Sequence, residues 1–568
     1  MTLTDSGAWK QVVFSDDPAF VESKACEFSM TMSGGRPCLL IGPWRAGDWS
    51  ARWQWKAPLV PLEGTIRGRY RTEGVLPFTC EVSYAYMRGS DRLRREGVSL
   101  EPAESWTAFE VAARRPPPGA EGVAPAFGLA AHTAGRVWFA DLVFSAGVAA
   151  VRFPAHPPLL ARKLPRRDFA RAPRFRVERD GDTWWFVTPG GRLFYSAGTD
   201  VPGFKDEAEG EKLAATVRGA GFNSLGGWSN VWRWGKLNDR HMAAGEPTFA
   251  AFHAVETSGL AGCGRLADPG EKGPPGDHSF PDPFDPAFGS AYRTLVADAA
   301  GEAAGKPWFA GWFIDNERDH ERLDRRVWSG HAGEAFRRRL EDRYRAVAGL
   351  NTAWGTSFAS FDAVARAKPV ALAREGTLYG DCLAFSREIV RRYVDSAVAA
   401  IREADPGGLV LTNRFMMGGI ADTLLYLDLY AACDVVAVNL YPANRSPGLS
   451  GDELAILGEI HRRTGKPILI GEWSVPALDS GLYDNPAKLD WSWPEAVETQ
   501  ADRAGQAALV TAGFYNVPYV IGAHWFTWRD FDSPKRRANR GLIRASGEPW
   551  RALLDSFAAI HARMGLTR

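Results

Sequence analysis

Two short apolar runs in the sequence each end in a glutamate. The first spans residues 308–317 and closes with Asp-Asn-Glu, where Glu317 is last. The second spans residues 466–473 and carries Glu472 directly after Ile-Leu-Ile-Gly. Apolar runs of this length between turn residues are typical of buried strands in a parallel sheet. A carboxylate at the end of such a strand loses hydration, so it is expected there mainly when it has a task.

Two carboxylic acids at strand ends predict acid–base chemistry on a sugar. Retaining glycoside hydrolases use one carboxyl group as the nucleophile and another as the general acid and base. In α/β barrels such groups lie at the C-terminal ends of the strands. Alternatively, Glu317 and Glu472 are ordinary polar residues where strands reach solvent. Because both occur in one series of strands, we favour the catalytic interpretation.

The sequence of the second part of the chain predicts the elements that would position Glu317 and Glu472. The amphipathic stretch from Arg387 to Ile401 repeats apolar residues at spacings of three and four, as in a helix. Eight alternating strand and helix units close into a barrel. The predicted fold class is therefore α/β, a (β/α)8 TIM barrel preceded by an all-β domain. Its strands are expected at residues 193–198, 223–228, 249–255, 308–316, 409–415, 435–441, 468–471 and 519–525.

The N-terminal 150 residues follow a different pattern. Short alternating segments such as 66–71, 80–86 and 137–144 are separated by Gly and Pro turns, which predicts a β-sandwich. Their order resembles jelly-roll carbohydrate-binding modules, although a purely structural sandwich is equally compatible with it. A Pro- and Arg-rich linker that lies along the barrel is expected next. The predicted division is a sandwich at 1–150, a linker at 151–183 and the catalytic barrel at 184–568.

Composition narrows the classes of partner. The 568 residues include 68 Lys and Arg against 67 Asp and Glu, so the net charge of +1 gives no reason to expect nucleic acid. The 22 tryptophans point instead to a sugar ligand, because flat aromatic faces suit sugar rings. No cofactor or metal is predicted, since the six cysteines lack metal-ligand spacing and look like reduced thiols. They are Cys26, Cys38, Cys80, Cys263, Cys382 and Cys433.

The sequence also suggests a location. The N-terminus has no basic segment followed by an apolar one, and no uninterrupted apolar stretch of 18 residues occurs. We therefore expect a cytoplasmic protein without a membrane partner. The oligomeric state cannot be read from the sequence.

Several motifs resemble known glycoside hydrolases. The Asn316–Glu317 pair on the fourth strand and Glu472 on the seventh resemble the pattern of clan A. Together with the stretch 350–358, Leu-Asn-Thr-Ala-Trp-Gly-Thr-Ser-Phe, and the hairpin at 188–198, they resemble family 50, the β-agarases. The Leu-Asn-x-x-Trp-Gly stretch is also similar to family 42 β-galactosidases. After Glu317 the chain continues Arg-Asp-His320, where agarases tend to have an aromatic residue and Gly.

The resemblance implies roles for individual residues. Glu317 would be the general acid and base and Glu472 the nucleophile. Asn316 would bond the sugar 2-hydroxyl, unless it is a strand-end turn residue. Trp528 would be the aromatic floor under the reacting sugar, unless it only packs. The remaining predicted substrate-binding residues are Tyr441, which would orient the nucleophile, and His253, Asn439 and His524, which could bind sugar hydroxyls.

Other residues near the strand ends are less strongly indicated as parts of the site. Each histidine is equally compatible with a role in the core or a loop. Asp315 is expected to be a structural hydrogen-bonding group. Long insertions at 257–287 and 318–385 are expected to shape the substrate cleft. Asp282 and Asp285 in the first insertion lack EF-hand spacing, so no calcium site is predicted.

The leading hypothesis is a retaining β-glycosidase acting on β-galactosidic links in agar-like or related oligosaccharides. A β-galactosidase or another clan A exo-β-glycosidase is the first alternative. The second is a non-catalytic carbohydrate-binding protein, against which the presence of both glutamates argues. A cytoplasmic location would favour imported oligosaccharides over intact polymer as the substrate.

Overall fold

The computed structural model divides the chain into two compact units. One comprises Met1–Ala150 and Phe336–Phe385, the other Val151–Ala335 and Ser386–Arg568. The residues that the structure describes are 9–14, 26–33, 36–44, 50–55, 64–75, 80–88, 91–113, 120–130, 135–146, 158–165, 168–260, 262–269, 275–276, 278–371, 374–417, 419–444, 447–483 and 495–566.

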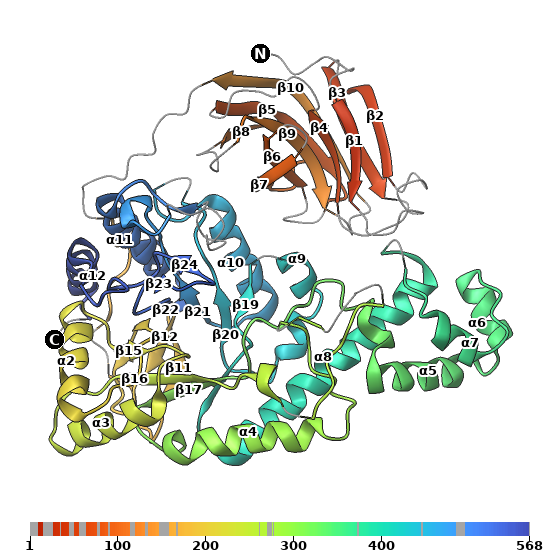
Figure 1. Cartoon of the computed structure of the whole chain (residues 1–568). Coiled ribbons are helices and arrows are strands. Elements are labelled where there is room, and N and C mark those ends of the chain that lie inside the picture. Colours follow the sequence, from red (N-terminus) through yellow and green to blue (C-terminus); the bar gives the residue numbers. More distant parts are fainter. Residues whose placement is uncertain are drawn as a thin grey trace. The chain divides into compact units, whose positions relative to one another are not determined.

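The N-terminal region is a sandwich of two antiparallel five-stranded sheets (Figure 1). One sheet has the order β1-β4-β9-β6-β7 and the other β2-β3-β10-β5-β8. The predicted all-β sandwich is therefore confirmed. Its strands are β1 (Trp9–Phe14), β2 (Cys26–Ser33), β3 (Arg36–Trp44), β4 (Ser50–Trp55), β5 (Gly64–Glu73), β6 (Cys80–Arg88), β7 (Asp91–Leu100), β8 (Thr107–Ala113), β9 (Gly122–Ala130) and β10 (Arg136–Ala146).

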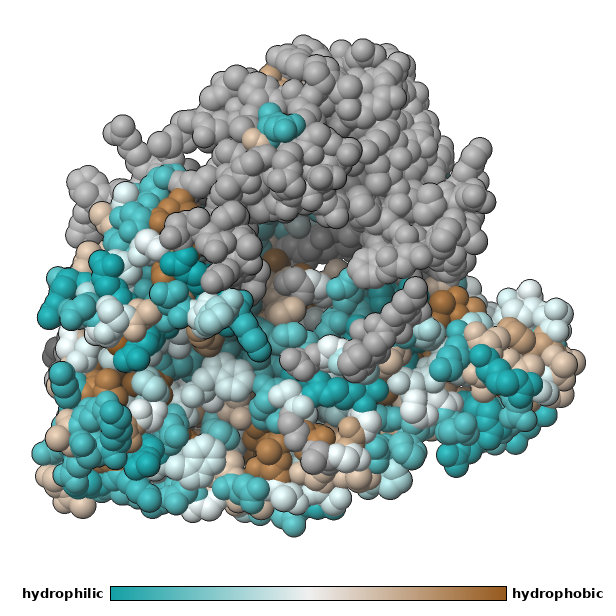
Figure 2. All heavy atoms as spheres, in the orientation of Figure 1, coloured by the Kyte–Doolittle hydropathy of each residue, from teal (hydrophilic) through white to brown (hydrophobic). Residues whose placement is uncertain are grey.

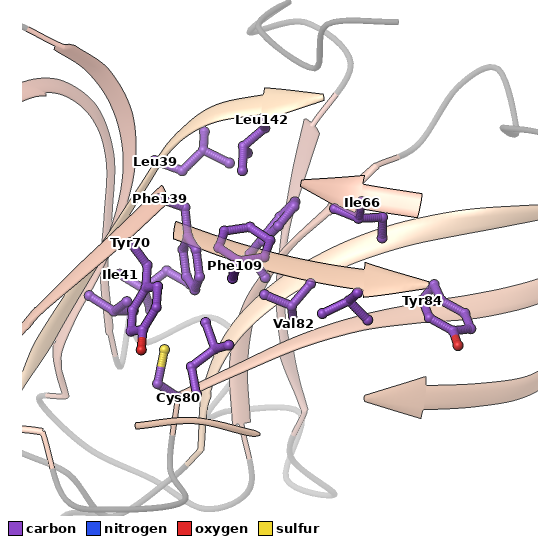
Figure 3. Close-up of a cluster of buried hydrophobic side chains, with 14 of the residues drawn as sticks. Leu39, Ile41, Ile66, Tyr70, Cys80, Val82, Tyr84, Phe109, Phe139 and Leu142 are labelled. Atoms are coloured by element: carbon purple, nitrogen blue, oxygen red, sulfur yellow. The ribbon is translucent and has the colours of Figure 1, made fainter. Parts of the chain in front are cut away.

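Alternation along the strands builds the core of this sandwich. In β5, Ile66 and Tyr70 are buried while Arg67 and Arg69 are exposed, which is the period-two pattern of a strand with one solvated face. Figure 3 shows side chains from both sheets, among them Phe139 and Val82, gathered in one cluster. Burial of each such apolar side chain contributes roughly 1.5–3 kcal/mol to folding.

A helical segment contains the Leu-Asn-x-x-Trp-Gly motif. Helix α6 (Val347–Trp354) ends at Gly355, whose φ of 69° is the left-handed cap that glycine adopts readily. The Asn351 side chain accepts hydrogen bonds from the Thr356 hydroxyl and the Phe358 amide. Trp354 Nε1 donates to Asp381 over 2.8 Å. The motif thus fixes a helix end and the turn after it, which is a structural role.

The barrel consists of parallel strands in the order β18-β17-β16-β15-β14-β22-β21-β20-β19. The fifth strand is split, because Arg414 between β18 and β19 has a φ of 50°. A bridge between Leu411 and Val435 joins β18 to the sixth strand and closes the ring. All eight predicted strands are present: β14 (Ser196–Thr199), β15 (Ser224–Leu225), β16 (Ala250–Ala254), β17 (Phe309–Phe313), β18 (Leu409–Leu411) with β19 (Phe415–Met416), β20 (Val436–Asn439), β21 (Ile468–Trp473) and β22 (Val520–Trp525).

A three-stranded antiparallel sheet precedes the first barrel strand. It consists of β11 (Arg176–Asp180), β12 (Thr183–Val187) and β13 (Leu193–Phe194). Phe186 of this sheet packs on Phe252 of the barrel interior, with ring centroids 5.7 Å apart. The linker was predicted to extend to residue 183, so β11 lies within the segment that was expected to lack structure. Residues 176–180 form a strand because they pair with the edge of β12 that β13 leaves open.

The described part of the linker lies on the barrel. Arg162 donates hydrogen bonds to the carbonyls of Val517 and Val520, over 3.1 and 2.9 Å. Its guanidinium carbon also lies 4.3 Å from the ring centre of Trp185. These contacts follow the expectation that the Pro- and Arg-rich segment runs along the second unit.

Helices follow the barrel strands in the connecting segments (Figure 1). Helix α8 begins eleven residues before the predicted stretch, and Ile389, Val394 and Ile401 on its apolar face are fully buried. The helices are α2 (Glu207–Gly219), α3 (Val231–Ala243), α4 (Phe288–Ala303), α5 (Gly330–Tyr344), α7 (Phe361–Ala367), α8 (Gly376–Ala404), α9 (Ile420–Thr423), α10 (Gly451–Thr464), α11 (Gln500–Asn516) and α12 (Arg551–Arg563). Shorter elements are η2 (Thr257–Gly259), η3 (Arg326–Trp328), η4 (Leu427–Tyr430), η5 (Leu478–Ser480), β23 (Phe531–Asp532) and β24 (Arg537–Ala538).

The surface in view is largely hydrophilic. Figure 2 shows small, separate hydrophobic areas between hydrophilic ones over the described residues. Among those residues, the helices include none that is both long and apolar enough to cross a membrane.

Candidate active site

Glu317 and Glu472 occupy the ends of the fourth and seventh barrel strands. Glu472 lies in β21 itself, whereas Glu317 follows β17 by four residues. Glu317 has a φ of 52°, in the left-handed region that non-glycine residues adopt rarely. Its amide donates to the carbonyl of Asn413 over 2.7 Å, and this bond anchors the unusual backbone to the fifth strand.

Glu472 is surrounded by donors and a cation. Trp228 Nε1 donates to its Oε1 over 2.7 Å, and the Tyr441 hydroxyl donates to Oε2 over 2.5 Å. Nη1 of Arg414 lies 3.1 Å from Oε1, at an angle that forms an ion pair and no hydrogen bond. Glu472 is only 5% exposed. This environment complements a negative charge on Glu472.

Arg414 is held mainly by aromatic rings. It is fully buried, and its guanidinium nitrogens form no hydrogen bond with the described residues. The guanidinium carbon lies 4.6 Å from the ring centre of Trp228 and 5.2 Å from that of Phe313. Cation–π attraction therefore replaces hydrogen bonds in fixing the charge beside Glu472.

Glu317 has a different environment. Asn439 Nδ2 donates to its Oε1 over 2.7 Å, and Nδ1 of the half-exposed His278 lies 3.8 Å from Oε2. Burial, and then the nearby charge of Glu472, raise the pKa of Glu317 above its ordinary value. The Asn439 hydrogen bond and the charges of Arg414 and His278 act in the opposite direction. The net direction favours a protonated acid.

Asp315 fixes the end of the fourth strand. Its Oδ1 accepts from the amides of Thr257 and Asn316, over 3.1 and 2.8 Å. Its Oδ2 accepts from the hydroxyls of Thr257 and Tyr393. Arg318 Nε lies 3.4 Å from Oδ1. This fully buried network is occupied by protein partners, so it positions Asn316 and Glu317.

A cavity of about 450 Å³ opens beside the acid. It has the size of a small-ligand site. Its wall combines carboxyl, amide, phenol and imidazole groups with two methionines, a mixture that suits a hydroxyl-rich ligand. The lining residues are His278, Glu317, Met416, Met417, Asn439, Tyr441 and Glu495.

Comparison with known proteins identifies relatives with named activities. Residues 270–483 match the family model Glyco_hydro_42, described as a β-galactosidase. Beta-agarase B of Vibrio sp. strain JT0107 is 23% identical over 356 residues, which cover 59% of this chain and 34% of that protein. The chain is related to the β-agarases of glycoside hydrolase family 50. The predicted resemblance to this family and to clan A is therefore confirmed.

Other relatives extend the comparison. Beta-galactosidase BgaH of Haloferax lucentense is 28% identical over 294 residues, which cover 48% of this chain and 41% of that protein. The match to Beta-agarase B spans about a third of that protein's length. All these relatives are named as glycoside hydrolases, so the predicted relationship to glycosidases holds.

Solved structures share the fold. The crystal structure of an agarase, AgWH50C, matches with a TM-score of 0.60 and 15% identity over 100% of both chains. An exo-β-agarase matches with a TM-score of 0.59 and 15% identity, over 96% of this chain and 97% of that one. These matches over nearly the whole chain support the predicted fold, a TIM barrel preceded by a β-sandwich.

Three of the predicted substrate-binding residues, Asn316, Asn439 and Tyr441, gather around the two glutamates. Asn439 Nδ2 also approaches Asn316 Oδ1, over 3.3 Å, so the two amides and Glu317 form one group. Tyr441, two residues after the end of β20, donates to Glu472. Trp528 is 4% exposed, and its carbonyl accepts from the Ile543 amide. Its role under a sugar stays a prediction.

The two predicted histidine ligands lie elsewhere. His524 is fully buried in the barrel, where its Nε2 is hydrogen-bonded to the Ser196 hydroxyl over 2.8 Å. Burial lowers its pKa to about 3. His253 packs between the rings of Trp232 and Trp312 and lines a separate cavity. The structure therefore does not bring either histidine to the carboxyl groups, because one lies too deep and the other points to the outer face of β16.

Three residues of the site were not singled out from the sequence. Trp228 and Arg414 contact Glu472 directly, and Asp200 accepts from the Trp228 amide over 3.0 Å. Burial and the charge of Glu472 raise the pKa of Asp200 to about 7. The sequence signal for Arg414 was its charge, because it lies inside the apolar run 409–415. Trp228 and Asp200 carry no signal of this kind, since strand-end tryptophans and aspartates are common.

The first insertion contains no cation site among the described residues. Asp282 accepts from the amides of Phe284 and Ala332, and Asp285 from those of Gly264 and Ala287. These carboxylates bind backbone donors and so hold the loop together. The second insertion was predicted as a long loop, but much of it is helical in α5, α6 and α7.

Proposed function

We propose that this chain is a retaining β-glycoside hydrolase that cleaves β-galactosidic links in agar-like or related oligosaccharides. The observation that carries the proposal is the asymmetry of the two strand-end carboxyls. Glu472 faces two donors and Arg414, whereas the pKa of Glu317 is raised by burial and by the charge of Glu472. A retaining hydrolase needs this combination of an ionised nucleophile and a neighbouring protonated acid.

The proposed reaction has two steps. In the first, the Glu472 carboxylate attacks the anomeric carbon while Glu317 gives its proton to the leaving glycosidic oxygen. The C–O bond to the leaving sugar breaks and a glycosyl ester on Glu472 forms. In the second step, Glu317 takes a proton from water, and the resulting oxygen displaces Glu472 from the anomeric carbon. The sugar leaves with its original β configuration.

Neighbouring groups have defined tasks in this scheme. The Tyr441 hydroxyl and Trp228 Nε1 orient the two oxygens of Glu472, so that one lone pair faces the sugar. Asn439 orients the acid, and Asn316 beside it is positioned to bond the sugar 2-hydroxyl. Hydrogen bonds to that hydroxyl strengthen in the transition state.

The substrate assignment is supported by the relatives. The curated relatives are named β-agarases and β-galactosidases, and both names refer to cleavage beside a galactose unit. The full-length structural matches include agarases, which favours an agar-type oligosaccharide. A β-galactosidase or another exo-acting enzyme of clan A is the second candidate, because residues 270–483 match the β-galactosidase model.

A panel of substrates tests the proposal. The purified chain is incubated with agar-derived oligosaccharides, β-1,4-galacto-oligosaccharides and aryl β-glycosides, and the first-formed anomer is followed by NMR. We expect hydrolysis of the agar-derived oligosaccharides with β product appearing first. An α product would exclude the retaining mechanism. Preference for aryl β-galactosides would favour the second candidate, and binding without any hydrolysis would favour a carbohydrate-binding protein.

A further inference from the structure

A short polar segment, residues 318–320, follows the acid Glu317 directly and reads Arg-Asp-His. It contacts residues 278–280 of the first insertion, and both segments belong to the same compact unit as the barrel strands. The first of three contacts joins the two backbones, because the Asp319 amide donates to the carbonyl of His278 over 2.9 Å. This bond fixes the distance between the two segments at that point.

Side chains supply the other two contacts. Nη1 of Arg318 donates to the carbonyl of Ser279 over 3.2 Å. The ring of His320 meets that of Phe280 edge-on, with centroids 5.0 Å apart. Arg318 and His320 are both buried, so these contacts are shielded from water. Three consecutive residues after the acid thus hold three consecutive residues of the insertion.

Arg318 also binds the backbone on the other side of the acid. Its Nε and Nη2 donate to the carbonyl of Asn316, over 3.0 and 2.8 Å. Nη2 further donates to Glu256 over 2.9 Å, and Nε lies 3.4 Å from Asp315 Oδ1. The bonds of a planar guanidinium fix direction as well as distance. One side chain therefore connects the insertion to the residue that precedes Glu317.

The backbone of Glu317 needs such support. Its φ of 52° lies in a region that non-glycine residues adopt seldom, and they persist there only when their surroundings hold them. The Glu317 amide donates to the carbonyl of Asn413, and Nδ2 of Asn413 donates to the Tyr430 hydroxyl over 3.4 Å. Nε2 of His320 is hydrogen-bonded to the same hydroxyl over 3.0 Å. The residues after Glu317 thus support its backbone from two directions.

The same contacts bring an imidazole to the acid. The side chain of His278 is 52% exposed and lines the cavity beside Glu317, with Nδ1 3.8 Å from Glu317 Oε2. Burial and the charge of Glu472 raise the pKa of Glu317, and a charge on His278 opposes them. The placement of His278 therefore contributes to the proton affinity of the acid.

Other titratable or charged groups face Glu317 from the elements around it. They are Glu472 on β21, Arg414 between β18 and β19, Tyr441 after β20, and Glu495, which lines the same cavity. His278 differs from the buried Arg414 because it is half-exposed and belongs to the insertion. Its imidazole can therefore be removed with little disturbance of the barrel.

We propose that Arg318 is a positioning residue for the general acid. It locks the first insertion against the end of the fourth strand, so that Glu317 faces the glycosidic oxygen and His278 stands beside Glu317. This inference rests on the proposed function, because it takes Glu317 as the group that protonates the leaving oxygen. Arg318 acts through Glu317, and the 318–320 segment thereby has a task in the reaction.

The first experiment compares leaving groups. Arg318→Met should lower kcat/KM for agar-derived oligosaccharides about 100-fold, because a displaced acid protonates the leaving oxygen poorly. For dinitrophenyl glycosides, which leave without protonation, the loss should stay within about threefold. Arg174→Met, which removes a buried arginine bound to Asp405, is the matched control. It should leave the ratio of the two values unchanged.

A milder variant covers the case in which Arg318→Met folds poorly. Arg318→Lys keeps the positive charge but cannot bind the carbonyls of Asn316 and Ser279 together, so the oligosaccharide value should fall about tenfold and the dinitrophenyl value should hold. Equal losses on both classes of glycoside, or no loss on either, would overturn the inference. Arg318 would then serve the fold alone.

A second experiment needs no turnover. The Glu317 carboxyl group is titrated by carbon NMR of glutamate-labelled protein, and Glu317→Gln identifies its signal. His278→Gln should move the titration to higher pH, because a charge that lowers the pKa of Glu317 is removed. Arg318→Met should move it in the same direction, and the double variant should move it no further. His331→Gln, at a 56% exposed histidine 3.9 Å from Asp285, is the matched control.

The titrations keep the two proposals apart. An unchanged titration in His278→Gln, or a further rise in the double variant, would overturn the inference and leave the proposed function intact. The expected titrations in a chain whose wild type hydrolyses none of the glycosides would support the placement of His278 by Arg318 and reject the proposed function.

Discussion

The ends of the fourth and seventh barrel strands carry the same side chain in opposite surroundings. Glu472 lies within strand β21 and faces Trp228, Tyr441 and Arg414. Glu317 sits on left-handed backbone, and among the described residues the side-chain amide of Asn439 donates to its carboxyl group. The first site complements a charge, whereas the second favours the protonated acid. The comparison teaches that the two roles are assigned by the neighbours and not by the glutamates themselves.

One strand supplies a donor to each site. Asn439 ends β20 and donates to Glu317, and Tyr441, two residues later, donates to Glu472. The sixth strand therefore couples the orientation of the two carboxyl groups. Substitutions around each glutamate should separate the contributions of the two carboxyl groups to turnover. The largest loss of turnover is expected at Glu472.

Replacing the nucleophile should have the largest effect. Glu472→Gly should lower turnover by about 10⁴-fold or more, because no group remains to form the covalent intermediate. Azide should restore part of the activity by entering the space that the side chain leaves, giving an α-configured glycosyl azide. A β-configured azide product, identified by NMR, would contradict the assignment of Glu472 as nucleophile. Thermal unfolding of the variant checks that the fold is retained.

Removing the acid should depend on the leaving group. Glu317→Ala should lower kcat/KM by about 10²–10⁴-fold for oligosaccharides, whose leaving oxygen needs a proton. For dinitrophenyl glycosides, which leave without protonation, the loss in kcat/KM should be far smaller. Steady-state kinetics on a series of aryl leaving groups measures the difference. Equal losses across the series would remove Glu317 from the role of general acid.

The donors at Asn439 and Tyr441 allow the two glutamates to be compared through the pH dependence of activity. Asn439→Ala removes a hydrogen bond that lowers the pKa of Glu317, so this pKa should rise further. Glu317 then stays protonated to higher pH, so the alkaline limb of the pH profile of kcat/KM should shift to higher pH. Tyr441→Phe should lower kcat/KM by about tenfold with little change in that limb. Tyr519→Phe, which alters a ring stacked on His461, is the matched control.

An unchanged alkaline limb in Asn439→Ala would show that another group controls the high-pH loss of activity. An alkaline limb that moves equally in Asn439→Ala and Tyr441→Phe would show that the two carboxyl groups titrate as one unit and that the separate assignments do not hold.

The sequence was sufficient to predict the barrel and to place Glu317 and Glu472 at the ends of two of its strands. The apolar runs that end at Glu317 and Glu472 predict buried strands directly, and both strands are found where the runs lie. Strand periodicity also held information about His253. In β16 the alternate residues Ala250, Phe252 and Ala254 face the barrel interior, so His253 between them must face outward.

The groups that distinguish the two glutamates could not be predicted in the same way. Trp228 and Arg414 come from the second and fifth strands, far from Glu472 in sequence, and meet it only when the barrel closes. The position of Arg414 beside Glu472 depends on the left-handed backbone of Arg414, which interrupts the fifth strand. How deep a strand residue lies in the barrel could not be predicted either, because strand residues of one face lie in successive layers. His524 is an example, since it is hydrogen-bonded to Ser196 inside the barrel.

Asp200 should have the smallest effect on turnover and a measurable effect on stability. Its Oδ1 accepts from the Trp228 amide, and its Oδ2 is buried without a hydrogen bond to the described residues. Burial, followed by the charge of Glu472, raises its pKa from 3.8 to about 7. Between these values the folded chain holds a proton that the unfolded chain has lost. The free energy of unfolding therefore falls as pH rises through this window and levels off above it.

Asp200→Asn should abolish this part of the pH dependence, because the amide carries no charge and its oxygen can still accept from Trp228. Relative to wild type, the variant should gain at least about 1.4 kcal/mol of stability between about pH 4 and about pH 8, since one pKa unit corresponds to that amount. Urea unfolding at both pH values measures it. Asp182→Asn, at a side chain that is 97% exposed, should show no such gain. An equal change in both variants would mean that Asp200 is ionised in the folded chain, so that Glu472 has a second negative charge close by and depends more strongly on Arg414.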